Sequence, residues 1–262
     1  MVLDLHYSVA GAITGFFVGM TGVGGGALMT PLLLIFFGVA PTTAVATDLW
    51  FAFFTKLFGF AAHSRSGNVD WKVVRRLWLG SLPVAIGIVF YVAHFHQLGK
   101  APWLSEAIGW VVMLTAFGLI LSPYLLAKGR AQRIGSPDTF KHIQPLLTLL
   151  AGAILGVCVS LTSIGAGALG SVMLLYLYPL RLTPHRLVAT DIVHAIPLAA
   201  VAGMLYLWAG LVDINMLLSL LIGSVPAVYF GSILANKMPG RIIQLILAIV
   251  LMLASVKMLS HI

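Results

Sequence analysis

The sequence predicts an all-α polytopic membrane protein made of two inverted-topology repeats of about five helical segments each, with glycine-split short helix pairs. Apolar residues make up 60% of the 262 residues and charged residues only 8%, whereas a soluble domain carries about 25% charged residues. The apolar residues form continuous stretches of the length that crosses a bilayer as a helix, about 17–25 residues. In addition, much of the first half of the chain recurs in the second half.

Composition also excludes several other classes of protein. An outer-membrane barrel would alternate apolar and polar residues, which these continuous stretches do not do. The net charge of +8 comes from basic residues in short loops between apolar segments, so membrane topology explains it better than a nucleic-acid partner. No basic stretch precedes the first apolar segment, so we expect no cleavable signal peptide. The single cysteine, Cys158, excludes a disulfide framework.

The internal repeat is carried by glycines and polar residues as well as by apolar ones. The run GAITG at 11–15 recurs as GAILG at 152–156, an offset of 141, and the glycine cluster at 21–28 meets 162–169. After a two-residue slip the offset becomes 143, and Pro41 and Asp48 meet Pro184 and Asp191. This register continues through Asp70/Asp213 to Pro83/Pro226. Hydrophobicity alone does not produce such matches, so we interpret the chain as a duplicated functional unit.

Glycine, proline and charge breaks divide each repeat into five apolar segments. In the first repeat these are 6–21, 27–38, 42–63, 73–95 and 105–127, and in the second they are 145–162, 168–179, 184–208, 214–234 and 240–259. The first two segments of each repeat are short, so each pair is either two tilted spans or a broken, re-entrant helix pair. The predicted organisation is a first membrane repeat at 1–127, a basic linker at 128–144 and a second repeat at 145–262.

The positions of lysine and arginine predict the sidedness. Twelve of the 15 basic residues lie in loop 64–76, the linker 128–144, turn 180–186 and turn 235–241. The positive-inside rule makes these four regions cytoplasmic and places both termini outside. Loop 64–76 and its repeat partner 207–214 then lie on opposite faces, so the second copy is inverted. Inverted repeats are typical of secondary transporters, which bind substrate at the repeat interface near the midplane.

The glycine clusters are the candidate substrate site. A helix that starts just after such a cluster points free N–H groups and the positive end of its dipole at an anion. Two helix starts, at about Ala27 and Ala168, would form a small anion cradle if they arrive from opposite sides. The alternative is tight helix packing through small residues. The candidate substrate-binding residues are Thr21, Gly24, Gly25, Gly26, Thr162, Ser163, Gly165 and Gly167.

Asp48 and Asp191 are the only acidic residues deep inside predicted spans, since Glu106 is at the edge of segment 105–127, and they follow Thr47 and Thr190 at equivalent positions. Intramembrane acids usually face a cavity or carry protons or cations. We therefore expect these two to couple transport to protons or cations, or to gate it. The equal alternative is a pair of buried tethers that brace a symmetric scaffold.

Two further residues are candidates for coupling or gating. Lys56 lies about two turns beyond Asp48, where it either pairs with that aspartate, supplies positive charge to an anion, or snorkels towards the cytoplasmic helix end; snorkelling is the preferred interpretation. His194 lies three residues after Asp191, and Phe51 occupies its position in the first copy. It is either a proton relay or a structural hydrogen-bonding group.

No nucleotide-binding loop, nucleophile elbow or histidine-rich metal motif occurs in the sequence, so we expect no enzyme activity, cofactor or metal. The segment GFFVGMTGVGGGALMTPLL at 15–33, followed by Ala46-Thr47-Asp48 and echoed at 152–191, resembles the TauE/SafE family of membrane permeases, often called sulfite exporters. The second motif departs from the first, with Ser163 and Ala166 in place of Gly22 and Gly25.

The resemblance implies a permease of the bacterial inner membrane that moves a small sulfur-containing anion, such as sulfite, sulfoacetate or another organosulfonate. The architecture favours alternating access with ion coupling. A passive anion channel, and a cation or metal permease that uses the two aspartates, are the alternatives. The sequence does not decide the direction of transport or whether the chain forms a homo-oligomer.

Overall fold

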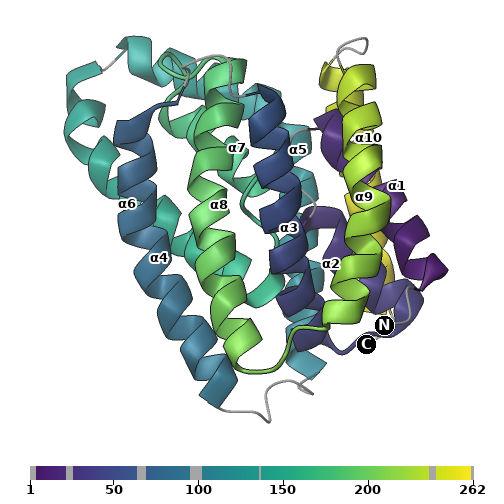
Figure 1. Ribbon diagram of the computed structural model, residues 1–262. Helices are drawn as coiled ribbons and strands as arrows, with labels where there is room; N and C mark the ends of the chain where they lie inside the picture. The colour runs from purple at the N-terminus through teal and green to yellow at the C-terminus, as the bar shows by residue number, and fades with distance from the viewer. Residues whose placement is uncertain are drawn as a thin grey trace.

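The computed structural model describes residues 4–21, 26–63, 69–94, 102–135, 137–235 and 240–260. Within these ranges the regular structure is entirely helical, in agreement with the predicted class (Figure 1). The helices are α1 (Leu5–Thr21), α2 (Gly26–Phe37), α3 (Pro41–His63), α4 (Trp71–His94), α5 (Pro102–Gly135), α6 (Pro137–Thr162), α7 (Ala168–Leu177), α8 (Pro184–Trp208), α9 (Ile214–Ala235) and α10 (Gly240–Ser260).

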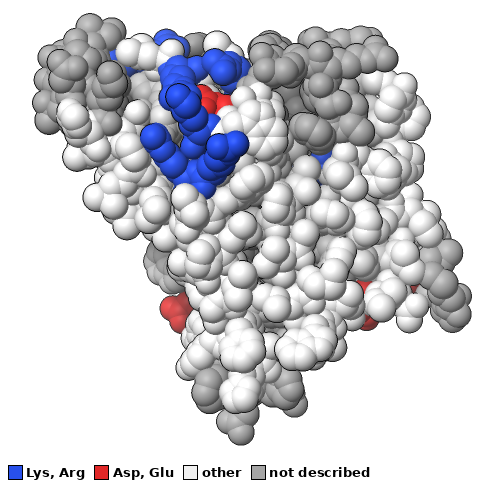
Figure 2. Space-filling model, turned by 60° about the vertical axis from the view of Figure 1, so that its left-hand side comes forward, with Lys and Arg blue, Asp and Glu red and all other residues white. Residues whose placement is uncertain are grey.

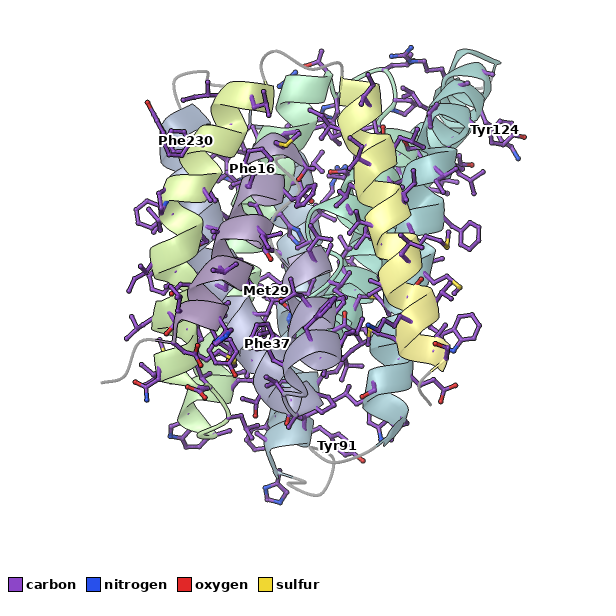
Figure 3. The ribbon with its side chains drawn as sticks, turned by 90° about the vertical axis from the view of Figure 1, so that its right-hand side faces the viewer. Phe16, Met29, Phe37, Tyr91, Tyr124 and Phe230 are labelled. Atoms are coloured by element: carbon purple, nitrogen blue, oxygen red, sulfur yellow. The ribbon has the colours of Figure 1, made fainter. Side chains whose placement is uncertain are left out.

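Among the described residues, six helices contain a stretch that is long and apolar enough to cross a membrane. These stretches are Trp71–His94, Trp103–Ala131, His142–Thr162, Arg186–Trp208, Ile214–Leu234 and Ile242–Ser260. Large apolar side chains cover their outer faces, and the aromatic rings of Tyr91, Tyr124 and Phe230 point outwards (Figure 3). A multi-pass membrane protein needs such a surface, because lipid rather than water contacts it.

The two short helices, α2 and α7, fold back along the helix that precedes each of them. The ten residues of α7 extend only about 15 Å, roughly half of the hydrocarbon core. Gln144 near the start of α6 donates a hydrogen bond of 2.7 Å to the carbonyl oxygen of Leu177 at the end of α7. Tyr7 near the start of α1 stacks on Phe37 at the end of α2, with ring centroids 4.7 Å apart. Each short helix therefore returns towards the start of the longer helix before it, and the choice between two tilted spans and a re-entrant pair stays a prediction.

Helices α5 and α6 extend into the predicted linker. The sequence segments stop at residue 127 and restart at 145, whereas α5 runs to Gly135 and α6 begins at Pro137. Lysine and arginine are good helix formers, and proline is favoured in the first turn of a helix. The charged residues therefore end the apolar segment but do not end the helix.

Helices α3, α5, α7 and α9 end, and α4, α6, α8 and α10 begin, at one end of the molecule (Figure 1), which we call the basic end. Figure 2 shows lysine and arginine side chains gathered there around a small acidic patch. Helix α1 begins and α10 ends at the opposite end. The structure thus places the described parts of the four predicted basic regions together, and their cytoplasmic location stays a prediction.

Glycines allow the closest helix crossings. A Cβ atom on Gly11 of α1 would lie 2.0 Å from the carbonyl oxygen of Leu220 in α9. Likewise, a Cβ atom on Gly152 of α6 would lie 2.5 Å from the carbonyl oxygen of Leu77 in α4. Only a residue without a Cβ permits such backbone contact. Helices α1 and α6 are therefore fixed against α9 and α4, while α3 and α8 lie side by side between these two pairs (Figure 1).

Candidate functional site

The two aspartates are buried, on neighbouring helices that run in opposite directions. Asp48 is the eighth residue of α3 and Asp191 the eighth residue of α8, and their exposed fractions are 0% and 2%. The preceding threonines fix the two helices to distant elements. Thr190 Oγ1 accepts a hydrogen bond of 3.0 Å from the backbone N–H of Asp70, and Thr47 Oγ1 accepts one of 3.1 Å from that of Asp213.

The Asp48 carboxylate lies near the start of the short helix α2. Thr30 Oγ1 donates a hydrogen bond to Asp48 Oδ2. Asp48 Oδ1 is buried and has no hydrogen-bond partner among the described residues. The side chain of Ser163, from the turn that precedes α7, lies beside the same carboxyl group. Its hydroxyl is also buried and unpartnered within the described part of the chain.

The Asp191 carboxylate lies at the start of the other short helix, α7. The backbone of Gly167, the residue before α7, lies beside it, as expected for an anion at the positive end of a helix. A Cβ atom on Gly170 would lie 2.6 Å from Asp191 Oδ1, so glycine leaves the space that this carboxylate occupies. Asp191 Oδ1 has no hydrogen-bond partner among the residues described.

Lys56 reaches this second carboxylate across the interface between α3 and α8. Its Nζ lies 3.8 Å from Asp191 Oδ2 and donates a hydrogen bond of 3.2 Å to the carbonyl oxygen of Ala166. The Lys56 side chain is only 4% exposed. The preferred interpretation of a snorkelling lysine is therefore wrong, because an acidic partner and a carbonyl group hold the ammonium inside the molecule.

His194 belongs to the same half of the site. Its Nε2 lies 3.0 Å from Ser81 Oγ of α4, and its backbone carbonyl accepts a hydrogen bond of 3.2 Å from Trp78 Nε1. His194 Nδ1 is buried without a partner in the described part of the molecule. Both expected roles remain open, since one ring nitrogen has a structural partner and the other is available to move a proton.

The structure describes three of the five candidate glycines. Gly24 and Gly25 lie outside the described residues, and Gly26 begins α2. Gly165 and Gly167 have φ angles of 132° and 127°, which favour glycine.

The hydroxyls of this region also differ. Thr162 Oγ1 lies 2.6 Å from the carbonyl oxygen of Cys158 and accepts a hydrogen bond of 3.1 Å from the N–H of Ile164, so it holds the turn before α7. Thr21 donates to the carbonyl of Phe17 in its own helix. Ser163, whose φ is 58°, has the buried hydroxyl without a partner among the described residues.

Three residues that the sequence did not single out complete the site: Thr30, Ser81 and Gly170. Ser81 had a signal, because it recurs as Ser224 in the repeat. Thr30 lies inside the segment that resembles the TauE/SafE family, but its neighbours are mostly apolar, so the sequence did not mark it as a functional residue. Gly170 corresponds to Met29 at the offset of 141, so no repeated glycine marked it.

The arrangement brings opposite charges and unpaired acceptors and donors together in an enclosed place. Each buried polar atom without a partner costs about 1–3 kcal/mol, and four such atoms belong to Asp48, Ser163, Asp191 and His194. A separate apolar cavity of about 270 Å³ lies between α1, α2 and α10 and contacts none of these residues. Among the described residues, no group of three or more His, Cys, Asp or Glu side chains could hold a metal ion.

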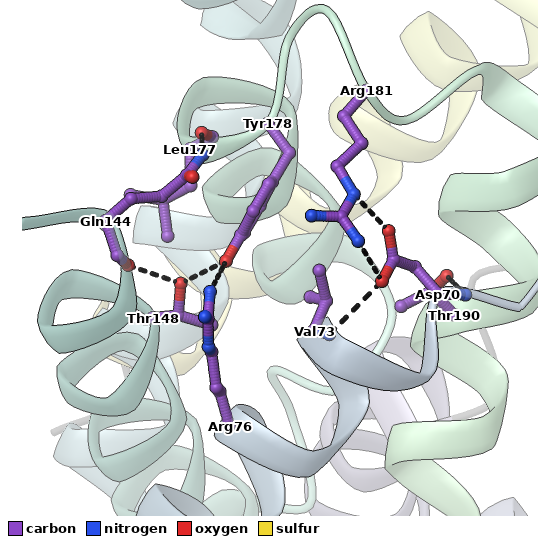
Figure 4. A network of polar contacts seen from close by, with 9 residues as sticks. All are labelled: Asp70, Val73, Arg76, Gln144, Thr148, Leu177, Tyr178, Arg181 and Thr190. Carbon is purple, nitrogen blue, oxygen red and sulfur yellow. Dashed lines mark hydrogen bonds and ion pairs between the residues drawn. The ribbon is translucent and has the colours of Figure 1, made fainter. Parts of the chain in front are cut away.

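A polar network connects the site with the basic end (Figure 4). The Arg181 guanidinium binds both carboxylate oxygens of Asp70, and Asp70 contacts Thr190, the residue before Asp191. Beside it, Arg76 donates to the hydroxyl of Tyr178. These contacts fix the α7–α8 connection to the start of α4.

Comparison with known proteins agrees with this arrangement. The family described as Sulfite exporter TauE/SafE matches residues 7–258. The probable membrane transporter protein YjnA of Bacillus subtilis (strain 168) is 38% identical over 265 residues, with 98% of this chain and 100% of the relative covered. YdhB of the same organism, also a probable membrane transporter protein, is 28% identical, with 88% and 90% covered. No solved structure matches the chain. The chain therefore belongs to the TauE/SafE sulfite exporter family, a family of multi-pass membrane transporters rather than enzymes.

Proposed function

We propose that this protein is a secondary transporter that moves a small sulfur-containing anion, such as sulfite, sulfoacetate or another organosulfonate, by alternating access. The observation that carries the proposal is the enclosed polar cluster at the starts of α2 and α7, with one ammonium group among its buried side chains. Helix starts attract anions, and an enclosed site between two helix bundles is what alternating access requires. The sulfur chemistry rests on the family.

The proposal includes two inverted repeats, one made of α1–α5 and the other of α6–α10. In support, the packing partners exchange in pairs when the halves are exchanged: α1 packs on α9 and α6 on α4, while α10 contacts α2 and α5 contacts α7. The hydrogen bonds Thr190–Asp70 and Thr47–Asp213 exchange in the same way. The helices α3 and α8 run in opposite directions (Figure 1), as an inverted pair does.

Within this scheme, the N–H groups that open α7 and α2 and the Ser163 hydroxyl bind the anion, and the aspartates couple its movement to protons. Asp48 suits a proton carrier, because no ion pair to it occurs among the described residues and an ionised carboxylate without a cation is costly in a buried site. Rocking of one half against the other would open the site to each side in turn.

Uptake into proteoliposomes tests the proposal. We expect the purified protein to accumulate radiolabelled sulfite or sulfoacetate above its external concentration when a proton gradient is imposed, and Asp48→Asn to lose that accumulation. Movement only down the anion's own gradient would identify a passive channel. Competition by divalent metal ions, with no effect of sulfite or organosulfonates, would identify a cation permease and refute the proposed substrate class.

A further inference from the structure

We infer that Lys56 holds the negative charge of the transported anion, and that Asp191 occupies this place as an internal counterion when no substrate is bound. The inference rests on the proposed function, because it assumes that the transported species is an anion. It assigns different work to the two aspartates, although they occupy equivalent positions in the two copies.

The first argument is the geometry of the ion pair. A direct charge-assisted hydrogen bond between an ammonium and a carboxylate is about 2.7–2.9 Å long, whereas Lys56 Nζ and Asp191 Oδ2 are 3.8 Å apart. The ammonium has three donors, and one of them contacts the carbonyl oxygen of Ala166. Asp191 thus balances the charge of Lys56 without a direct hydrogen bond, and a further acceptor can bind the ammonium.

The second argument is that Asp191 sits where an anion would sit. Its carboxylate lies beside the backbone of Gly167 at the start of α7, and the absence of a side chain at Gly170 makes room for Oδ1. Helix starts of this kind bind sulfate, phosphate and carboxylate groups through backbone N–H donors. An oxyanion of sulfur would use the same N–H and the same ammonium, so the carboxylate and the substrate compete.

The third argument is that buried polar atoms of this half of the site have no partner among the described residues. His194 Nδ1 is a potential donor and Asp191 Oδ1 is an acceptor, while the unpartnered Ser163 hydroxyl lies beside Asp48. Leaving such groups unpaired is costly. An anion placed against Lys56 would accept from His194 Nδ1, and a proton on the displaced Asp191 would convert its carboxylate into a donor as well.

Displacement of the Asp191 carboxylate from Lys56 couples anion binding to proton binding. A carboxylate that loses its cation inside the molecule is expensive unless it takes a proton. One proton therefore binds Asp191 as one anion binds Lys56, and the two move together. No covalent bond forms or breaks in this step apart from the O–H bond of the protonated carboxyl group.

The groups that face Asp191 define the controls. These are Lys56 from α3, His194 from α8 itself, and the Asp70–Arg181 pair that contacts Thr190. Helix α4 adds the uncharged Ser81 and Trp78. By the offset of 143, Ala199 in the second copy corresponds to Lys56, so Asp48 has no equivalent lysine.

The test is equilibrium binding of radiolabelled sulfite to the purified full-length protein in detergent at a fixed pH. We expect Lys56→Met to bind at least roughly tenfold more weakly than the wild type, and Asp191→Asn to bind more tightly, because the competing charge is gone. The double variant, which keeps the charge balance of the pair, should fold and still fail to bind. Lys257→Met, which removes an exposed ammonium on α10, serves as the matched control and should bind like the wild type.

A pH series with methanesulfonate, which stays ionised throughout, examines the coupling. Wild-type binding should weaken as pH rises, because the ionised Asp191 competes, and Asp191→Asn should lose this dependence. A dependence that persists in Asp191→Asn and disappears in His194→Gln would overturn the inference, as would normal binding by the double variant. If neither the wild type nor Asp191→Asn binds any sulfur anion, the proposed function itself fails. If the wild type binds and Lys56→Met binds equally well, only the inference fails.

Discussion

Replacing Gly80 by alanine examines the tight crossing of α4 and α6. A Cβ atom at Gly80 would lie 2.1 Å from the carbonyl oxygen of Leu149 and 2.8 Å from the backbone nitrogen of Ala153. Ordinary contact begins at 3.4 Å, so the two backbones would have to separate by about 1.3 Å. Neither neighbouring atom belongs to a flexible side chain, so a rotamer change cannot relieve the clash.

The expected cost follows from measured effects of overpacking. Inserting a methyl group into a well-packed contact costs about 1–3 kcal/mol, and backbone-to-backbone contact favours the upper end. For a chain of this size, each kcal/mol shifts the melting temperature by about 2–4 °C. We therefore expect Gly80→Ala to lower the apparent melting temperature by roughly 4–10 °C.

Gly87 provides the matched control on the same helix. It is exposed, and a Cβ atom there would have nothing within 4 Å. Gly87→Ala should leave stability unchanged or raise it by up to about 1 kcal/mol, because alanine is the better helix former. Both variants are measured by thermal unfolding in detergent, with monodispersity on size exclusion as the readout. An equal melting temperature for Gly80→Ala and Gly87→Ala would refute the assigned crossing.

Three further predictions concern the caps, the site and the sidedness. Thr190→Val and Thr47→Val should each destabilise the protein by about 0.5–2 kcal/mol in the same thermal assay, because each removes the acceptor for the N–H of Asp70 or Asp213, the residue before α4 or α9. Thr115→Val, whose hydroxyl bonds a carbonyl of its own helix, should cost less, and the reverse order would contradict the cross-helix hydrogen bonds. Gly170→Ala should displace the Asp191 carboxylate and change sulfite affinity, whereas Gly118→Ala, which meets only Val172 at an ordinary 3.7 Å, should not; equal affinities would argue against the assigned position of Asp191. In a Cys158→Ala background, a membrane-impermeant thiol reagent should label Ile214→Cys in intact cells and Lys72→Cys only after permeabilisation, and the opposite pattern would reverse the assigned topology.

Much of the fold was predictable because hydrophobicity and helix-breaking residues act locally. The predicted segments 42–63 and 184–208 fall within one residue of α3 and α8, since Pro41 and Pro184 mark where each helix can begin. The largest errors occur at the α5–α6 connection. There the apolar pattern ends eight residues before α5 does, because charged residues leave the membrane without leaving the helix.

The partner of Lys56 was not predictable from the sequence. Eight residues along one helix separate Lys56 from Asp48 by about 12 Å, so these two side chains cannot form a close pair. The contact with Asp191 depends on α8 running opposite to α3, which brings residue 56 of one helix next to residue 191 of the other. Thr162 was predicted to bind substrate because it belongs to the repeated glycine cluster. A threonine at a helix end often bonds nearby backbone groups instead, and the repeat does not show which of the two roles Thr162 has.

The two repeats differ at the residues that we expect to bind a single negative charge. Close helix packing needs the same small residues in both halves, and the glycines at 11, 80, 152 and 223 all make backbone contacts. A cation is different, because a second buried ammonium beside Asp48 would hold a second anion or repel the proton that we assign to that aspartate. On the side of the site around Asp48, the positions that correspond to Lys56 and His194 hold Ala199 and Phe51. Asp48 therefore has no counterpart of either basic side chain. Under the proposed mechanism, the residues that match between the two repeats therefore form the moving scaffold, and the residues that differ limit the site to one anion.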